Sequence, residues 1–419
     1  MDNKKIRQTP EKKPGFFYGY IVVVAAFFIL LVGYGLFNIY GVFFKPLLAE
    51  FGWTRAITSG AFSVGMIMAG LLAVVTGGLT DRFGPRIVLT ACGCFLGAGF
   101  LLMSQISSIW QLYLFFGVIA GIGASGVWVP VLSTVARWFV KRRSMMTGIV
   151  LAGMGTGVLV APLVVSRLIA VYDWRMSYII MGITVLVVVV LASQFLKRAP
   201  TGIEPLPCGE NEAGEQEARP GTDGLSLIEA AHTRQFWMMM ALFFFFGFGL
   251  FSIMVHIVPH TIELGVNPIS AANVLSTLGG MGVLGNFVLG SLGDRIGSRY
   301  IFIIGFIMWM VALAWLLQAD QMWMLYIFAV LFGFAEGGMG PAESPLVADY
   351  FGLKHHGLIF GVVDIGFPIG AALGPFVNGY IFDITGSYQM AFLICGATSV
   401  ISLILAVMLG PAARLRVKT

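Results

Sequence analysis

The chain has 419 residues, of which 58% are hydrophobic and only 11% are charged. A soluble globular protein carries about 25% charged residues, so this chain has too few charges to cover a water-exposed surface. Its net charge of +5 is typical of topogenic Lys and Arg in a membrane protein rather than of a nucleic-acid partner. The composition excludes an ordinary soluble enzyme, a nucleic-acid-binding protein and a disordered chain, and it indicates a polytopic helical membrane protein.

Twelve apolar segments follow a polar N-terminal tail at 1–17, and each is long enough to cross a bilayer, which takes about 20 residues. A hydrophilic stretch at 197–235 divides them into two sets of six. We therefore expect a six-helix bundle at 18–196, a linker at 197–235, a second six-helix bundle at 236–410 and a tail at 411–419. The predicted spans are 18–44, 57–79, 86–107, 110–136, 144–168, 175–196, 236–261, 269–292, 300–318, 322–348, 356–381 and 388–409.

Lys and Arg are distributed unevenly between the two sides that these spans define. With the N-terminus inside, 21 of the 25 Lys and Arg residues lie in cytoplasmic segments. The remaining four are Lys45, Arg55, Arg167 and Arg175. Basic residues accumulate in cytoplasmic loops, so this bias predicts that both termini and the linker are cytoplasmic.

One sequence pattern occurs twice in the chain. Residues 77–86 read GGLTDRFGPR and recur at 290–299 as GSLGDRIGSR, an offset of 213 residues (290 − 77). The same offset relates Gly148 to Gly361. The chain is therefore predicted to be a duplicated six-span unit in parallel orientation, a design typical of transporters that bind substrate between two halves.

The repeated motif G-x-x-x-D-R-x-G-x-R resembles the signature of the major facilitator superfamily, and the resemblance covers nearly the whole chain. Residues 40–63 and 137–157 resemble more narrowly the monocarboxylate transporter family and the related oxalate–formate antiporter family of bacteria. The resemblance implies an all-α fold of twelve transmembrane helices in two parallel six-helix pseudo-repeats. It also implies a secondary active transporter that moves a small organic acid by alternating access, coupled to protons. We expect a monomer in the bacterial inner membrane.

Asp81 and Asp294 lie where helices are predicted to end at the cytoplasmic face. An aspartate there can accept hydrogen bonds from a neighbouring helix N-terminus and can pair with Arg. In the family this motif resembles a latch that keeps the cytoplasmic side shut. A structural turn with topogenic charges is the alternative. The expected latch residues are Asp81, Arg82, Arg86, Asp294, Arg295, Arg299 and Arg137.

Ionisable residues at membrane depth are costly and therefore indicate function. Glu336 lies in the middle of its predicted span among several glycines, and Glu343 follows seven residues later on the same helical face. We expect Glu336, Asp364 and His260 to carry protons. Two alternatives stay open: a gating or inter-helix pairing role for Asp364, and an ordinary hydrogen-bonded role for His260.

Polar and aromatic side chains in four spans are candidate substrate contacts. Tyr34, Asn38, Trp128 and Asn286 can supply hydrogen bonds and aromatic walls for a small organic molecule, together with Glu336. No metal or cofactor is expected. The sequence lacks H-E-x-x-H and Walker motifs, so catalysis and ATP-driven pumping are not expected either.

The chain departs from the family at three charged positions. Transporters of simple monocarboxylates typically have Lys, Arg and Asp at the positions of Asn38, Asn286 and Gly282. A buried carboxylate substrate needs a cationic partner or helix-terminal N–H groups in their place. The alternative is an exporter of amphiphilic, neutral or cationic compounds, with Glu336 as the counter-charge.

Overall fold

The computed structural model describes residues 17–53, 55–139, 141–198 and 224–410, and these ranges are almost entirely helical. The described residues contain twelve helical segments, some made of consecutive short helices, that are long and apolar enough to cross a membrane. This confirms the predicted all-α fold. Residues 1–16 and 411–419 of the predicted tails and 199–223 of the predicted linker lie outside the described residues.

The first half, with the first six spans, contains ten α-helices and three short helices of other pitch among the described residues. Two π-helical segments and one 3₁₀ segment, η1 (Leu30–Tyr34), η3 (Tyr113–Ala120) and η2 (Ile39–Phe43), lie within the first and fourth spans. The α-helices are α1 (Gly19–Ile29), α2 (Gly35–Asn38), α3 (Phe44–Phe51), α4 (Arg55–Phe83), α5 (Pro85–Met103), α6 (Ile109–Leu112), α7 (Gly121–Ala124), α8 (Val129–Trp138), α9 (Arg143–Val171) and α10 (Trp174–Gln194).

The last six spans are built from longer, more continuous helices. They follow α11 (Leu227–Ala231), a short helix at the end of the predicted linker. They are α12 (Arg234–Glu263), α13 (Pro268–Ile296), α14 (Ser298–Leu316), α15 (Met322–Phe351), α16 (His356–Asp364), α17 (Gly366–Thr385) and α18 (Gln389–Met408).

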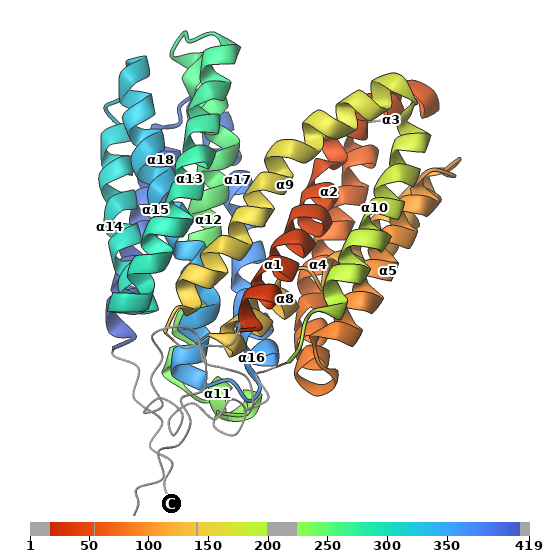
Figure 1. Cartoon of the computed structure of the whole chain (residues 1–419). Helices are drawn as coiled ribbons and strands as arrows, with labels where there is room; N and C mark the ends of the chain where they lie inside the picture. The colour runs from red at the N-terminus through yellow and green to blue at the C-terminus, as the bar shows by residue number, and fades with distance from the viewer. Residues whose placement is uncertain (1–16, 54, 140, 199–223, 411–419) are drawn as a thin grey trace, which may run out of the picture.

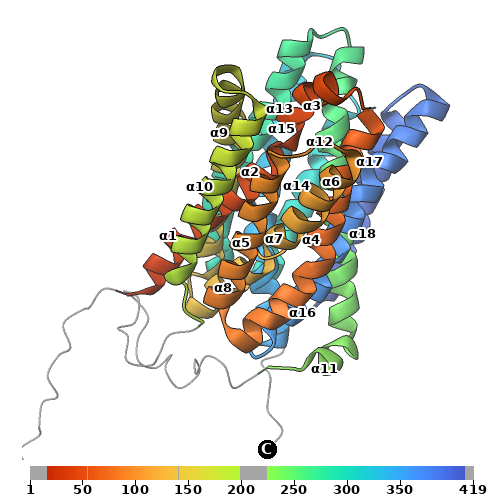
Figure 2. The same ribbon diagram turned by 90° about the vertical axis from the view of Figure 1, so that its right-hand side faces the viewer.

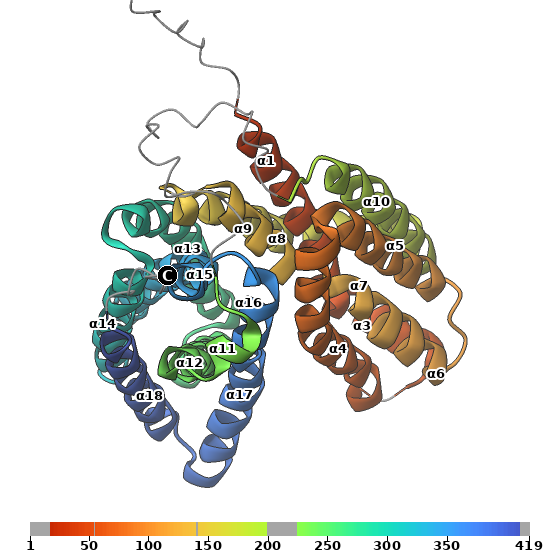
Figure 3. The same ribbon diagram turned by 90° about the horizontal axis from the view of Figure 1, so that it is seen from below.

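The helices form two groups that meet at one end of the molecule. Figure 3 shows helices of the range α1–α10 on one side and helices of the range α12–α18 on the other. The two groups adjoin at α8 and α9 of the first group and α16 of the second. In Figures 1 and 2 the ribbons of α8, α11 and α16 lie near one end and α3 lies at the opposite end. The two groups converge at the first of these ends, where α4 packs on α16 and α9 packs on α13. We call it the Asp81 end, after the residue near the end of α4.

The fourth span is interrupted where the sequence suggested one continuous helix over 110–136. The chain leaves helical geometry between α7 and α8, and Pro130 near the start of α8 has no N–H with which to continue the earlier helix. The carbonyl oxygen of Ser125, inside this break, accepts a hydrogen bond from the Thr76 hydroxyl of α4 at 3.0 Å. A side chain of a neighbouring helix thereby gives this carbonyl oxygen the hydrogen bond that lipid could not supply.

The end of the linker is tied to the second group of helices. Gly224 forms an isolated antiparallel bridge with Gly352. Ser226 caps α11, and its backbone N–H donates to the Glu229 carboxylate at 2.7 Å. This hydrogen bond and that of the Ser226 hydroxyl hold the pKa of Glu229 below its usual range.

Candidate functional site

Asp81 connects the two groups of helices at the Asp81 end. Its carboxylate accepts hydrogen bonds from the backbone N–H groups of Gly357 (3.1 Å) and Leu358 (2.9 Å). These residues lie in the first turn of α16, where helix N–H groups have no partner in their own helix. The carboxylate of one half thus caps a helix of the other half, and its charge is favourable at that N-terminus.

Asp294 does the same in the opposite direction. Near the end of α13, its carboxylate accepts hydrogen bonds from the N–H groups of Ser144 (2.7 Å) and Met145 (3.0 Å) in the first turn of α9. The two caps are related by the sequence repeat. The acceptors differ by 213 residues (294 − 81), and so do the first donors (357 − 144). The interface at this end is therefore pseudo-symmetric.

Glycines let the backbones of the two halves meet beside these caps. A β-carbon on Gly148 would lie 2.4 Å from the carbonyl oxygen of Asn286, and one on Gly77 would lie 2.3 Å from that of Gly357. Real β-carbons do not approach backbone so closely. Small residues at such crossings allow helices to pack at backbone distance in a membrane, so the Asp81 end is closely packed.

Arginine contacts break the symmetry of the interface. Arg137, which is buried, pairs with Asp81 and also donates to the carbonyl oxygen of Leu353 at 3.4 Å. The position that the repeat relates to Arg137 holds Tyr350 (137 + 213). The second cap thus lacks an arginine at the equivalent position.

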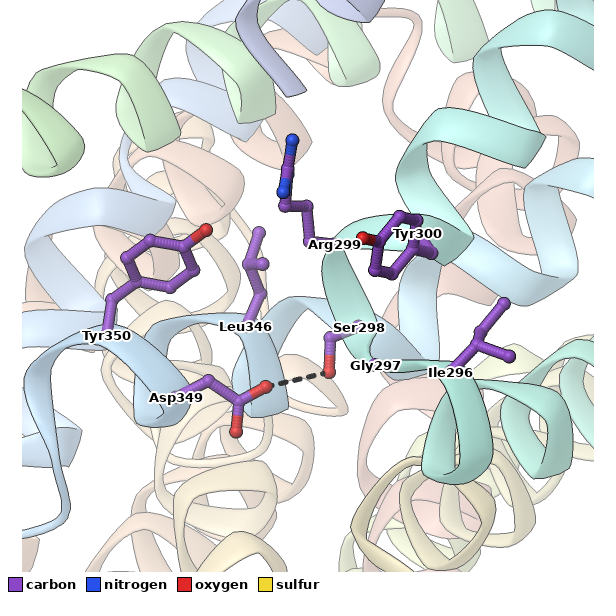
Figure 4. A pocket seen from close by; sticks show the side chains of 8 residues that line it. All are labelled: Ile296, Gly297, Ser298, Arg299, Tyr300, Leu346, Asp349 and Tyr350. Atoms are coloured by element: carbon purple, nitrogen blue, oxygen red, sulfur yellow. Dashed lines mark hydrogen bonds between the residues drawn. The ribbon is translucent and has the colours of Figure 1, made fainter. Parts of the chain in front are cut away.

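A second ion pair crosses between the halves. Arg143 of α9 lies 3.2 Å from the carboxylate of Asp349 on α15. Figure 4 shows Asp349 bonded to the Ser298 hydroxyl, at 3.3 Å. These residues of α15 and α14 border a pocket of about 200 Å³ that also includes Arg299 and Tyr350. The pocket lies at the Asp81 end and does not include the mid-span candidates.

The other predicted latch arginines make no contact between the halves among the described residues. Arg299 donates to the carbonyl oxygens of Ala406 (2.9 Å) and Val407 (2.7 Å), and so caps the end of α18 in its own half. The remaining three side chains are exposed, and one of them lies over the Phe83 ring. They are Arg82, Arg86 and Arg295.

Three carboxyl groups of the second half lie within electrostatic range of one tyrosine of the first. The Tyr34 hydroxyl interacts electrostatically with Asp364, Glu336 and Glu343. Glu336 is half-buried, whereas Glu343 and Asp364 are 1% and 8% exposed. No ion pair with Lys or Arg is found for these three carboxyl groups within the described part of the chain.

Two of these carboxyl groups have oxygens that lack a partner. Glu343 Oε2 and Asp364 Oδ1 are buried without a hydrogen bond from the described residues. An ionised carboxylate in such a place is costly. Both groups are therefore suited to holding a proton, and Glu343 adds a site that our sequence-based list omitted. Its seven-residue spacing from Glu336 was the available signal.

The candidate substrate contacts of the first half lie close together. The rings of Tyr34 and Trp128 have centroids 6.0 Å apart at an interplanar angle of 40°. Asn38 donates to the carbonyl oxygen of Tyr34 at 3.0 Å. All three side chains are half-buried, as is Asn286 of α13. The structure thus groups Tyr34, Asn38 and Trp128 and brings the tyrosine into electrostatic range of the carboxyl groups.

His260 lies elsewhere. Its ring contacts Phe392 and Tyr388 edge-on, with centroids 4.9 and 5.8 Å away. The neighbouring His256 is held by the carbonyl oxygen of Pro375, at 2.9 Å from Nε2. These contacts turn both rings toward α17 and α18 of their own half. Figure 3 shows α18 on the side of the second group that faces away from the first.

Comparison with known proteins agrees with this architecture. The family model of the Major Facilitator Superfamily matches residues 26–284 and 261–418. The chain belongs to the major facilitator superfamily. As a superfamily member it is a multi-pass membrane transporter, and the two matched segments together cover both groups of helices.

Individual relatives are similar over most of their length. Monocarboxylate transporter 13 of Rattus norvegicus is 28% identical over 384 residues, which cover 91% of this chain and 86% of the relative. An uncharacterised MFS-type transporter of Escherichia coli strain K12, YhjX, is 26% identical over 325 residues, 75% of this chain and 77% of the relative. The crystal structure of the human organic anion transporter MFSD10 matches with a TM-score of 0.73 at 16% identity, covering 95% of this chain and all of that one.

Proposed function

We propose that this superfamily transporter moves a small organic acid together with protons. The similarity to a protein named monocarboxylate transporter 13 supports the substrate class. The central observation is that Tyr34 lies within electrostatic range of three carboxyl groups, for which no ion pair with Lys or Arg is found among the described residues. Because a protonated carboxyl group is neutral, it can face a substrate anion that an ionised one would repel.

In this mechanism Glu336 and Asp364 carry the proton, and Glu343 lies between Glu336 and the Asp81 end of α15. Glu336 also contacts the substrate, with Tyr34, Asn38, Trp128 and Asn286 as further contacts. The substrate and the proton can drive the transport cycle only if each binds the two access states with different affinity. His260 is a weaker candidate for proton transfer, since its ring packs against α18.

Alternating access follows from the caps at the Asp81 end. We propose that Asp81, Asp294 and Arg137 form the latch that keeps this end closed, and that Arg143 and Asp349 reinforce it. The exposed side chains of Arg82, Arg86 and Arg295 then anchor the protein at the membrane surface. Arg299 stabilises its own half through the cap at the end of α18. Opening the end breaks both caps together, because the same rocking movement separates α4 from α16 and α9 from α13.

We also propose an orientation and a location. The Asp81 end faces the cytoplasm, with both termini and the linker on that side, as the distribution of Lys and Arg favours. The chain is a monomer in the inner membrane of a bacterium, where the relative from Escherichia coli supports a bacterial setting. In this orientation the structure is closed to the cytoplasm.

A second candidate function is the export of neutral or cationic amphiphilic compounds. The three carboxyl groups near Tyr34 favour it, because carboxylates paired with a cationic substrate need no proton. This candidate differs from the first in one measurable property: proton movement would run opposite to substrate movement.

The test is uptake into proteoliposomes with an imposed inward proton gradient. The panel is lactate, pyruvate, acetate, a dicarboxylate, an aromatic acid and a lipophilic cation. Uptake of a carboxylate that collapses when the gradient is dissipated supports the first candidate. Movement of the cation alone, driven by a gradient of opposite sign, supports the second and overturns the first.

A further inference from the structure

The interface between α13 and α15 is built on glycine. A β-carbon on Gly285 would lie 2.1 Å from the carbonyl oxygen of Phe334, and one on Gly337 would lie 1.9 Å from that of Gly282. In both cases the obstacle is the backbone of the other helix. These glycines are needed because the two helices cross at backbone distance.

Gly282 is a glycine for a different reason. The nearest atom to a β-carbon built there is the carboxylate oxygen Oε2 of Glu336, at 2.7 Å. The next nearest atoms are the carbonyl oxygen of Gly333 at 3.6 Å and Cδ of Glu336 at 3.9 Å, which are ordinary van der Waals contacts. Only the carboxyl group of Glu336 therefore excludes a side chain at this position.

We propose that Gly282 is the positioning residue of Glu336. Its bare α-carbon leaves the space in which the carboxyl group lies against α13, and this sets the direction in which the group points. Because Gly337 fixes α15 against α13, the backbone of Glu336 cannot withdraw. A methyl group at 282 must then turn the Glu336 side chain away from α13.

The inference rests on the proposed role of Glu336 but concerns a different residue and has a separate readout. The change is Gly282→Ala, and the matched control is Gly280→Ala on the same helix, where a β-carbon meets nothing within 4 Å. The first measurement is the infrared C=O stretch of the protonated Glu336 carboxyl group in reconstituted protein at low pH. The band is identified by its loss in Glu336→Gln.

We expect Gly282→Ala to shift this band, because its frequency reports the surroundings of the carboxyl group, and Gly280→Ala to leave it in place. An unchanged band in Gly282→Ala overturns the inference. Neither result depends on whether a transport substrate has been found, so failure here is distinguishable from failure of the proposed function in the uptake assay.

The second measurement is a double-mutant cycle in thermal unfolding, which separates the carboxyl contact from helix packing. Gly282→Ala should lower Tm by about 2 °C or more in the native background, as overpacking does. It should have no such effect beside Glu336→Ala, and Glu336→Asp should restore part of the loss, because its carboxyl group is one methylene shorter. An equal loss in the native and Glu336→Ala backgrounds would assign Gly282 to helix packing and overturn the inference.

Discussion

Asp81 and Asp294 cap helices of opposite halves at positions that the 213-residue repeat relates to each other. Each carboxylate thus stabilises the interface by accepting hydrogen bonds from a helix N-terminus of the other half. The arrangement explains why the motif is duplicated. With a single cap, α9 and α13 would lose the hydrogen bonds that Asp294 accepts, and close backbone packing, as at Gly148 and Asn286, would remain between them.

The first prediction concerns this latch. Asp81→Asn removes the charge that favours the N-terminus of α16 and the ion pair with Arg137. Hydrogen bonds to charged groups contribute about 1.5–3 kcal/mol, so the closed state should lose about tenfold or more in population. Ser344→Cys reports the change, because Ser344 is fully buried and bonds across the halves to the carbonyl oxygen of Leu132 at 3.4 Å.

The measurement is the rate at which an impermeant maleimide labels Ser344→Cys, with the four native cysteines replaced by Ser. Asp81→Asn should raise this rate, and Asp320→Asn, at an exposed position between α14 and α15, should not. Equal rates in the Asp81→Asn variant and its parent would show that the cap does not hold this end closed.

The second prediction concerns proton coupling. Gln cannot take up a proton, so Glu336→Gln should flatten the pH dependence of uptake and reduce gradient-driven accumulation about tenfold or more. The matched control is Glu263→Gln, because Glu263 is exposed at the end of α12. Initial rates measured over a series of pH values provide the test. A Glu336→Gln transporter with the native pH profile would exclude Glu336 as the proton carrier.

The third prediction concerns the end opposite Asp81. Glu50 lies 2.6 Å from Arg175 and accepts a hydrogen bond from the Trp174 indole at 2.6 Å. The Arg175 hydrogen bond lowers the pKa of Glu50. Both charged side chains are over a third exposed, so water screens the pair and its contribution should be less than about 1 kcal/mol.

The sign of the pH effect follows from the lowered pKa. The stabilisation is present above the pKa of the unfolded chain and is lost as the pH falls through the lower folded value. Glu50→Gln should therefore reduce Tm slightly near pH 7, and the difference from the native protein should shrink at acidic pH. A difference that grows on acidification would contradict the assignment of this ion pair.

The fourth prediction tests the missing cation. Asn286 is half-buried on α13, one helical turn from Gly282. Asn286→Arg should lower the KM for a carboxylate about tenfold, since a guanidinium pairs with a carboxylate through two hydrogen bonds. Asn273→Arg, nearer the opposite end of the same helix, is the control. A folded Asn286→Arg variant with unchanged KM would place Asn286 outside the substrate site.

The apolar runs were sufficient to predict the twelve spans, because the length that a bilayer demands is a strong constraint. The break at Ser125–Trp128 was harder to predict. Pro130 was a visible signal, but membrane helices often continue through proline, and the contact that satisfies the freed backbone comes from Thr76, far away in sequence. Local sequence does not specify such a partner.

Site residues were predictable only to the level of the span. Depth along a helix follows from the sequence, which is why Glu336, in the middle of its predicted span, was a candidate. The direction of a side chain depends on the helices that surround it. His260 was a candidate for proton transfer because histidine titrates near neutral pH, with an ordinary hydrogen-bonded role as the alternative, and its ring packs against Phe392 of α18. Glu343 was noted on the same helical face as Glu336 but was not included among the proton carriers.

The most direct test of proton-coupled transport is a record of internal pH in proteoliposomes that contain a trapped pH-sensitive dye. An inward lactate gradient is imposed at equal internal and external pH, and protein-free vesicles correct for passive entry of the neutral acid. If Glu336 carries the proton, internal acidification is faster with the native transporter than with Glu336→Gln. Protein-mediated lactate uptake that leaves internal pH at the level of the protein-free control would contradict proton-coupled transport.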